Sequence, residues 1–238
     1  MEKKGGGIFD NSEMNFVNSE FTREQVLKNV DSKRSQFQVT NKGIEIEDFH
    51  YQYKQINKEV NFLFVGSDFH RKGLDIALKT IYKLKESDSN YSFFLRVVGE
   101  NSELESTFIP IIEEYNLENN VEFLGRRSKN EIKQYHNDSH FSLLPSREEA
   151  FGVSVIEALA SGTTAICSNT GGIPSIIEHN EDGILVEVED TLGLVEAILG
   201  LIRNEKKRES ITKNGLLKAE KFDFDNIYQD ILNEINNV

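Results

Sequence analysis

Between residues 60 and 190, short apolar runs alternate with amphipathic helical segments, and this alternation limits the possible folds more than any other feature. The run VNFLFVGS (60–67) is apolar almost throughout, as in strands that are buried on both faces of a parallel sheet. The next segment, 73–87, repeats apolar residues at 74, 77, 78, 81 and 84, which is the spacing of one helix face. This order predicts right-handed βαβ units around a parallel sheet.

The same pattern predicts six strands between residues 60 and 190. After the first strand, the other five are expected at 91–99, 121–125, 139–146, 163–169 and 183–190. The remaining helices are expected at 103–116, 129–137, around Glu157, at 173–180, 191–203 and 206–221, and from 225 onward. Pro110 falls inside one of these helices, and we expect a kink or break there because proline lacks the amide hydrogen that the helix needs. The prediction is an α/β fold with a Rossmann-like doubly wound parallel sheet.

Before residue 60, a short strand is expected at 13–19, a helix at 21–30 and a strand at 37–45. The last of these ends in an Asn41-x-Gly43 turn.

Composition excludes several classes of function. The formal net charge of −13 makes nucleic acid and anionic membrane surfaces improbable general partners. No run approaches the roughly 20 apolar residues that a membrane helix requires, and the first residues lack the apolar core of a signal peptide. The single cysteine, Cys167, lies in a predicted buried strand and is expected to be a structural thiol in a reducing compartment.

The segment PSREEAFGVSVIE joins a predicted buried strand to a predicted helix, and folds of this class present their sites at such junctions. Glu149 belongs to the turn and Glu157 lies more than one turn inside the helix, with seven residues between them. The two carboxylates are therefore expected to hold different parts of one long ligand. The backbone amides of Phe151, Gly152 and Val153, at the helix start, are expected to bind sugar hydroxyls or phosphate.

A second junction, VGSDFHRKGLD, follows the first buried strand. The strand ends at Gly66 and Ser67, and Arg71 and Lys72 directly precede the next helix. Helix amino-termini attract anions through their free amides, and two cations at the same place would add charge-assisted hydrogen bonds. This arrangement predicts a diphosphate site. The alternative, that Arg71 and Lys72 are solvated loop charges, stays open from the residues alone.

Two further strand ends carry candidate residues. Arg126 follows the third strand of the series, and Ser128 with Glu131 has the spacing of a helix capping box. Gly171 and Gly172 follow the fifth strand, where they indicate either a ligand contact or a turn that needs a positive φ angle.

Together these motifs resemble the retaining glycosyltransferases of family 4, the group 1 glycosyl transferases with the GT-B fold. The E-x7-E motif, with PS before it, FG inside it and EALASG after it, is the most specific match. The resemblance covers about residues 13 to 238. It implies transfer of a sugar from a UDP-, GDP- or ADP-linked donor to an acceptor, with retention, in the synthesis of cell-envelope polysaccharide or lipopolysaccharide.

The resemblance also implies roles for individual residues. Glu157 would accept hydrogen bonds from the ribose hydroxyls, Glu149 would contact the donor sugar, and Arg126 would lie near the nucleobase. Arg71 and Lys72 would stabilise the leaving diphosphate, with Arg71 replacing a family arginine at the position of Ser67. The remaining expected donor-binding residues are Gly66, Ser67, Phe151, Gly152, Val153, Gly171 and Gly172. The family requires no metal and no cofactor, and the five histidines show no metal-ligand spacing.

In terms of domains, the resemblance implies a remnant of an amino-terminal acceptor domain and crossover at 1–45, a donor-binding domain at 46–222 and a carboxyl-terminal crossover helix at 223–238. A missing amino-terminal domain or a partner chain would bind the acceptor. The strand near 14–18 would then be disordered, re-paired or covered by a second chain.

The resemblance further implies a cytoplasmic protein, and it leaves open a peripheral position at the inner membrane face for a full-length parent. Two other functions stay open: a non-catalytic nucleotide-sugar-binding subunit that needs a partner chain, and another GT-B enzyme such as a nucleotide-sugar epimerase.

Overall fold

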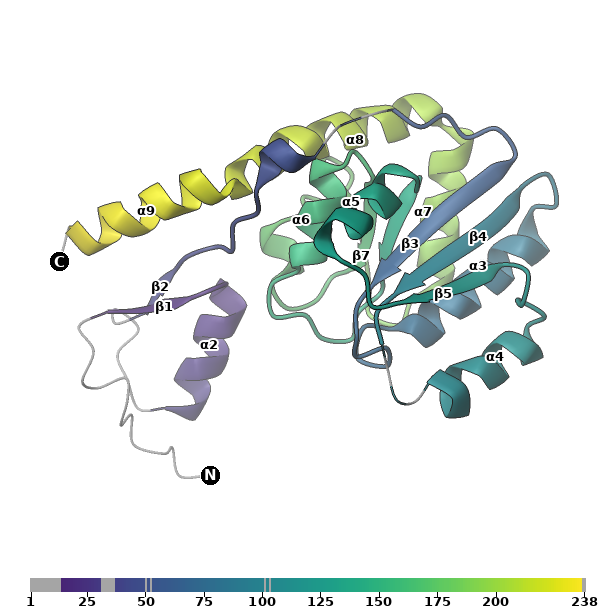
Figure 1. The fold of residues 1–238 in the computed structure, drawn as a ribbon, viewed down its shortest axis with the longest axis horizontal. Coiled ribbons are helices and arrows are strands. Elements are labelled where there is room, and N and C mark those ends of the chain that lie inside the picture. Colours follow the sequence, from purple (N-terminus) through teal and green to yellow (C-terminus); the bar gives the residue numbers. More distant parts are fainter. Residues whose placement is uncertain are drawn as a thin grey trace.

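A computed structural model describes residues 14–30, 37–49, 51, 53–100, 102 and 104–236. Figure 1 shows a large α/β unit and, beside it, a small unit that contains β1, α2 and β2. None of the helices in this described part of the chain combines the length and apolarity that a membrane crossing requires.

The large unit is built on a six-stranded sheet in which every strand pairing is parallel. Its strands are β3 (Glu59–Val65), β4 (Ser92–Val98), β5 (Val121–Gly125), β6 (Phe141–Leu144), β7 (Thr164–Ser168) and β8 (Ile184–Val186). The order across the sheet is β5-β4-β3-β6-β7-β8. From β3 the chain adds β4 and β5 toward one edge of the sheet. It then returns to the other side of β3 and adds β6, β7 and β8 toward the opposite edge. The predicted Rossmann-like doubly wound sheet is confirmed.

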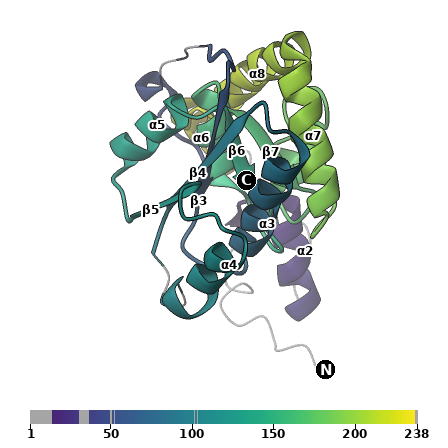
Figure 2. The same ribbon diagram turned by 90° about the vertical axis from the view of Figure 1, so that its right-hand side faces the viewer.

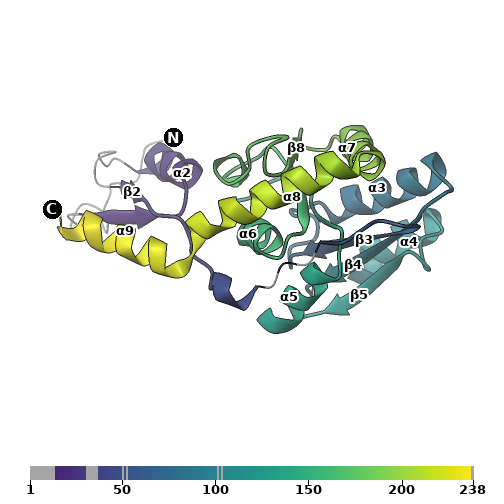
Figure 3. The same ribbon diagram turned by 90° about the horizontal axis from the view of Figure 1, so that it is seen from above.

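Helices cover both faces of this sheet. The helices are α3 (Leu74–Ser87), α4 (Ile109–Glu114), α5 (Lys129–Asn137), α6 (Val153–Ala160), α7 (Thr191–Arg203) and α8 (Glu205–Ala219). Figures 2 and 3 show α3 and α7 on one side of the strands and α5 on the other. In addition, α4 packs on α3, and α6 packs on α8 and α5.

In β6, β7 and β8, side chains alternate between two hydrophobic cores, as the strand period requires. In β7, Ile166 joins the core under α3 and α7, whereas Ala165 and Cys167 join the core under α6. Cys167 is fully enclosed, and burial raises the pKa of its thiol far above the ordinary range. This agrees with the expected structural role of the thiol.

Pro110 breaks the predicted helix at 103–116, as expected. Residues Leu104–Phe108 wind as a π-helix, and the α-helix proper starts at Ile109 with Pro110 in its first turn. Proline is tolerated in a first turn because the amide it lacks would have no partner there.

Two predicted elements near the end of the sheet are longer than the observed ones. The helix expected at 173–180 is wrong beyond a short 3-10 turn, η4 (Ile173–Ser175). The carboxylate of Asp182 accepts the amide of Glu178 at 2.7 Å, which folds the following stretch into a turn. The strand expected at 183–190 is limited to β8, because the chain turns at Glu189 with a φ of 65°.

The small unit pairs β1 (Asn15–Val17) with β2 (Phe37–Val39) in parallel, beside α2 (Glu20–Asn29). Of the three fates considered for the early strand, re-pairing is therefore observed within the chain. The strand expected at 37–45 is wrong beyond Val39, because only an isolated bridge from Ile44 to Asp223 follows it. Residue 13 of the expected first strand lies outside the described residues.

The chain passes between the two units twice. On the way out it forms the 3-10 turn η2 (Ile46–Asp48), and on the return it forms η5 (Glu220–Phe222) and then α9 (Phe224–Asn236). Figures 1 and 3 show α9 leaving the large unit beyond α8 and running beside the small unit. The Asp223 carboxylate accepts the Ile46 amide at 3.4 Å, so Asp223 links the two passages.

Two histidines are buried, His136 near the end of α5 and His140 just before β6. His136 is fully enclosed, and both of its ring nitrogens are without a hydrogen-bond partner among the described residues. Burial, with the charge of Lys54 as a smaller contribution, lowers the pKa of His136 to about 3. His140 accepts the amide of Asn61 on Nδ1 at 2.9 Å, and burial followed by the charge of Arg208 lowers its pKa to about 4.

These histidines predict a loss of stability in acid. Below pH 6.5 both histidines are protonated in the unfolded chain but stay neutral in the folded chain. The free energy of unfolding therefore decreases as the pH falls from 6.5, until His140 is protonated in the folded chain at about pH 4 and His136 at about pH 3. At 1.36 kcal/mol per pKa unit, His140 alone accounts for a loss of about 3 kcal/mol by pH 4. Urea unfolding across this pH range measures the effect. His136→Leu is expected to flatten the profile and the exposed control His70→Gln to leave it unchanged; a profile that His136→Leu does not alter would contradict the prediction.

Candidate functional site

Most of the predicted site residues gather at the carboxyl ends of β3 and β6, which are neighbours in the centre of the sheet. The chain leaves β3 toward one edge of the sheet and leaves β6 toward the other. The loops that follow these two strands therefore diverge and leave a crevice between them, which is where open α/β sheets bind ligands.

Lys72 and Glu149 form an ion pair across this crevice, although 77 residues separate them in the sequence. Their side chains are only 14% and 10% exposed. The other carboxylate oxygen of Glu149 accepts the amide of Phe151 at 3.4 Å. The carboxylate is therefore oriented by its own turn and by a cation from the neighbouring loop.

The ion pair lies in the wall of a hollow of about 380 Å³, called here the Lys72 hollow. It is lined by Asn18, Lys42, Val65, Gly66, Ser67, Asp68, Arg71, Lys72, Glu149, Ala150, Phe151, Gly152, Val153 and Ser154. Eight predicted site residues are thus brought together. The other six lining residues were not predicted as site residues from the sequence: Asn18, Lys42, Val65, Asp68, Ala150 and Ser154.

A second hollow of about 270 Å³, the Glu157 hollow, adjoins the first at Val153, which lines both. It is lined by Gly43, Ile44, Glu45, Phe49, Lys129, Lys133, Val153, Glu157 and Phe224. The Lys133 ammonium stands 4.9 Å from the centre of the Phe49 ring, in a cation–π contact. This hollow therefore combines two acidic residues, two lysines and two aromatic rings.

Burial raises the pKa of Glu157 to about 6, against the lowering effect of Lys129 and Lys133. An isolated buried carboxylate resists ionisation because charge is poorly solvated in the interior. Hydroxyl groups of a ligand would supply the missing hydrogen bonds, since an ionised carboxylate only accepts. The environment of Glu157 thus favours a ligand that brings hydrogen-bond donors.

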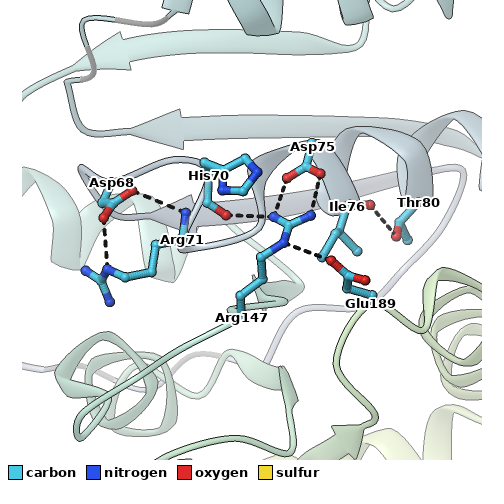
Figure 4. A network of polar contacts seen from close by, with 8 residues as sticks. All are labelled: Asp68, His70, Arg71, Asp75, Ile76, Thr80, Arg147 and Glu189. Carbon is cyan, nitrogen blue, oxygen red and sulfur yellow. Dashed lines mark hydrogen bonds and ion pairs between the residues drawn. The ribbon is translucent and has the colours of Figure 1, made fainter.

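Arg71 lines the Lys72 hollow as predicted, but its guanidinium is already engaged. Its Nε donates to Asp68 at 2.9 Å and its Nη1 donates to the carbonyl of Glu148 at 3.1 Å. Figure 4 shows the Arg71 and Asp68 side chains side by side, directed away from Asp75. Because Asp68 neutralises it, Arg71 carries less effective charge toward a ligand than the sequence suggested.

Arg147, two residues before Glu149, supports the site and was not predicted from the sequence. It donates to both carboxylate oxygens of Asp75 at 2.8 Å, to Glu189 at 3.0 Å and to the carbonyl of His70 at 2.7 Å (Figure 4). These bonds to Asp75, with some help from Glu189, raise the pKa of the arginine. Arg147 thereby joins the Glu149 turn to the loop and helix that carry Lys72.

Gly171 and Gly172 lie beneath the Glu149 turn and do not line either hollow. The amide of Gly172 donates to the carbonyl of Glu149 at 2.9 Å. Gly171 has a φ of 58°, and a Cβ placed there would come within 1.7 Å of the same carbonyl oxygen. The glycine pair therefore has a positioning role: it lets two backbones approach closely and sets the height of the turn.

Arg126 is exposed after β5 and lines neither hollow. The capping box predicted next to it is confirmed, with Ser128 and Glu131 exchanging side-chain and backbone hydrogen bonds at the start of α5. The helix so begun places Lys129 and Lys133 in the Glu157 hollow. Their spacing of four residues, which puts them on one helix face, is the sequence signal that could have identified them.

The described residues contain no group of three or more His, Cys, Asp or Glu side chains arranged to hold a metal ion. The positive charges that line the two hollows belong to lysine and arginine side chains. In the Lys72 hollow, the carboxylate of Asp68 is paired with Arg71 and that of Glu149 with Lys72.

Three comparisons with known proteins bear on this site. A family model described as "Glycosyl transferases group 1" matches residues 45–218. An uncharacterised glycosyltransferase of Methanocaldococcus jannaschii is 32% identical over 184 residues, which cover 73% of this chain and 49% of the relative. The N-acetyl-alpha-D-glucosaminyl L-malate synthase of Bacillus anthracis is 31% identical over 60% of this chain and 39% of its own length. The chain thus spans about half, or less, of the curated relatives it matches.

Among solved structures, the Anabaena protein Alr3699/HepE, crystallised with UDP and glucose, is similar over 95% of this chain and 63% of its own, with a TM-score of 0.83 and 18% identity. At this identity the likeness concerns the fold alone.

Proposed function

This chain belongs to the group 1 glycosyl transferases and has the Rossmann-like doubly wound sheet of one half of a GT-B enzyme, and from that premise we propose that it binds a nucleoside-diphosphate sugar and serves its transfer to an acceptor. The proposed reaction breaks the bond between the anomeric carbon and the diphosphate oxygen. The acceptor oxygen forms the new bond to that carbon and gives up its proton, and the nucleoside diphosphate leaves.

The proposal rests on one observation: two hollows of different chemical character meet at Val153, which lines both. The Glu157 hollow offers a carboxylate for the ribose hydroxyls and aromatic rings for a base. The Lys72 hollow offers cations and the amide end of α6 for a diphosphate, with Glu149 beside them for the sugar. A nucleotide sugar is the kind of ligand that needs both hollows at once.

Within this proposal, Lys72 acts on the leaving group. Negative charge develops on the diphosphate as the bond to the sugar breaks, and a cation already in place stabilises that charge without rearrangement. Glu149, held by Lys72 and by the Phe151 amide, accepts a hydroxyl of the sugar and orients it. Arg71 supports the same diphosphate, to a smaller extent because Asp68 shares its charge.

Retention of configuration, independence from metal ions and a product of the cell envelope complete the proposal. The support for these three points is the E-x7-E motif and its resemblance to family 4 enzymes.

The proposal is tested by calorimetric titration of the chain with UDP, GDP and ADP, and then with their sugar conjugates. We expect saturable binding of one nucleotide, weakened in both Lys72→Ala and Glu157→Ala. Absence of binding to all of them would overturn the proposal. Turnover of the sugar conjugate by this chain would exclude a non-catalytic nucleotide-sugar-binding subunit, and turnover that requires no acceptor would indicate an epimerase.

The raised pKa of Glu157 predicts how nucleoside binding depends on pH. The ionised carboxylate accepts two hydroxyl hydrogen bonds and the protonated form does not, so affinity is expected to fall as the pH decreases below about 6. The loss approaches about tenfold per pH unit in the acid limit, because one proton must leave before binding. Uridine is the suitable probe, since it has no phosphate to titrate, and NMR titration measures its weak binding. Glu157→Gln should give weak, pH-independent affinity; a wild-type affinity that does not change between pH 7 and about pH 5 would contradict the assignment.

A further inference from the structure

Lys42 is an exposed side chain that lines the Lys72 hollow from the crossover between the two units. It belongs to neither of the loops at the carboxyl ends of the strands. The hollow is therefore enclosed by four separate parts of the chain: the loop with Lys72, the turn with Glu149, Asn18 after β1, and this crossover segment.

The backbone on both sides of Lys42 is held in place. Before it, the amide of Thr40 donates to the carbonyl of Val17 at 2.8 Å. After it, the amide of Ile44 donates to the carbonyl of Phe222 and the carbonyl of Ile44 accepts the amide of Phe224, both at 2.9 Å. The position of Lys42 thus follows from backbone contacts to both units.

The charges around the hollow distinguish Lys42 from its other cations. Lys72 is paired with Glu149 and Arg71 with Asp68, so each of these cations already faces a carboxylate. Within the described residues, Lys42 forms no ion pair. Because a sugar diphosphate carries a negative charge on each phosphate, the two internal pairs alone leave its charge without compensation.

We propose that Lys42 binds the diphosphate of the donor. Its ammonium would supply positive charge to the phosphates, because the charges of Lys72 and Arg71 are already balanced by Glu149 and Asp68. This inference rests on the proposed function and extends it, since it assigns part of the donor site to the crossover segment. Binding of the diphosphate would then also fasten the crossover, and with it the small unit, to the large unit.

The test compares how Lys42→Gln affects UDP, UMP and uridine, with affinities measured by calorimetry or NMR. We expect the variant to weaken UDP about tenfold, the effect of one charge-assisted hydrogen bond, to weaken UMP less and to leave uridine unchanged. Lys42→Arg should recover most of the UDP affinity, and added salt should reduce the difference between wild type and variant. Lys206→Gln is the matched control, because Lys206 is exposed on α8 and lines neither hollow.

An unchanged UDP affinity in Lys42→Gln, with wild-type binding of UDP intact, would overturn the role of Lys42 and leave the proposed function standing. Equal weakening of UDP and uridine would also overturn it, because the loss would then be structural. Failure of wild-type chain to bind UDP, GDP and ADP would instead remove the proposed function on which the inference rests.

Discussion

Replacing Lys72 with alanine is expected to lower the rate constant of sugar transfer by about two to three orders of magnitude, as loss of a pre-organised group in an electrostatic site does. Lys72 is the least exposed cation that faces the Lys72 hollow, and its ammonium is already fixed by Glu149. The measurement is release of nucleoside diphosphate from the sugar conjugate identified by titration. Lys79→Ala provides the control, because Lys79 is exposed on the adjacent helix and lines neither hollow.

Lys72→Ala also leaves the carboxylate of Glu149 largely buried without its cation, a change that costs about 3–5 kcal/mol in buried pairs. The double variant Lys72→Ala, Glu149→Gln removes the unpaired charge and should regain much of that stability without regaining activity. Transfer within about twofold of wild type in a folded Lys72→Ala protein would contradict a role of Lys72 at the leaving group.

Gly171→Ala is expected to cost several kcal/mol of folding free energy, on the order of 3 or more, and to weaken donor binding with it. The new Cβ would lie 1.7 Å from the carbonyl oxygen of Glu149, and the φ of 58° is itself unfavourable for alanine. Since that carbonyl belongs to backbone, the clash can be relieved only by moving the Glu149 turn. Urea unfolding and UDP titration measure the two effects.

Gly200→Ala is the matched control for this substitution. Gly200 lies inside α7, and a Cβ there would meet nothing within 4 Å. Alanine should therefore stabilise the chain by about 0.5–1 kcal/mol through helix propensity and leave UDP affinity unchanged. If Gly171→Ala were as stable as wild type and bound UDP equally well, the glycine pair would not set the height of the turn.

Local patterns were sufficient to predict much of the fold. The apolar run that became β3 and the helix-spaced apolar residues of α3 indicate burial through a period that neighbouring residues display by themselves. The capping box at Ser128 is equally local, because both partners lie within one helical turn. The E-x7-E motif indicated a candidate site for the same reason: its turn and its helix are continuous in sequence.

Contacts between segments that are far apart in the sequence could not be predicted from local patterns. The partners of Arg147 lie on α3, on the loop before it and on the turn after β8, and nothing near Arg147 in the sequence identifies them. Lys42 and Phe224 line the two hollows because a backbone bridge joins the outward and return passages between the units. The helix expected at 173–180 was likewise replaced by a turn that the Asp182 carboxylate holds.

The sequence by itself thus determined the class of the sheet, the positions of most strands and helices, and the residues of the Lys72 and Glu149 junctions. These features depend on hydrophobic period and turn chemistry, which act over a few residues. Tertiary structure decided that β3 and β6 are neighbours, that Lys72 and Arg71 already have carboxylate partners, and that α5 and the crossover complete the walls. These features depend on which loops the strand order brings together, and strand order reflects packing of the whole chain.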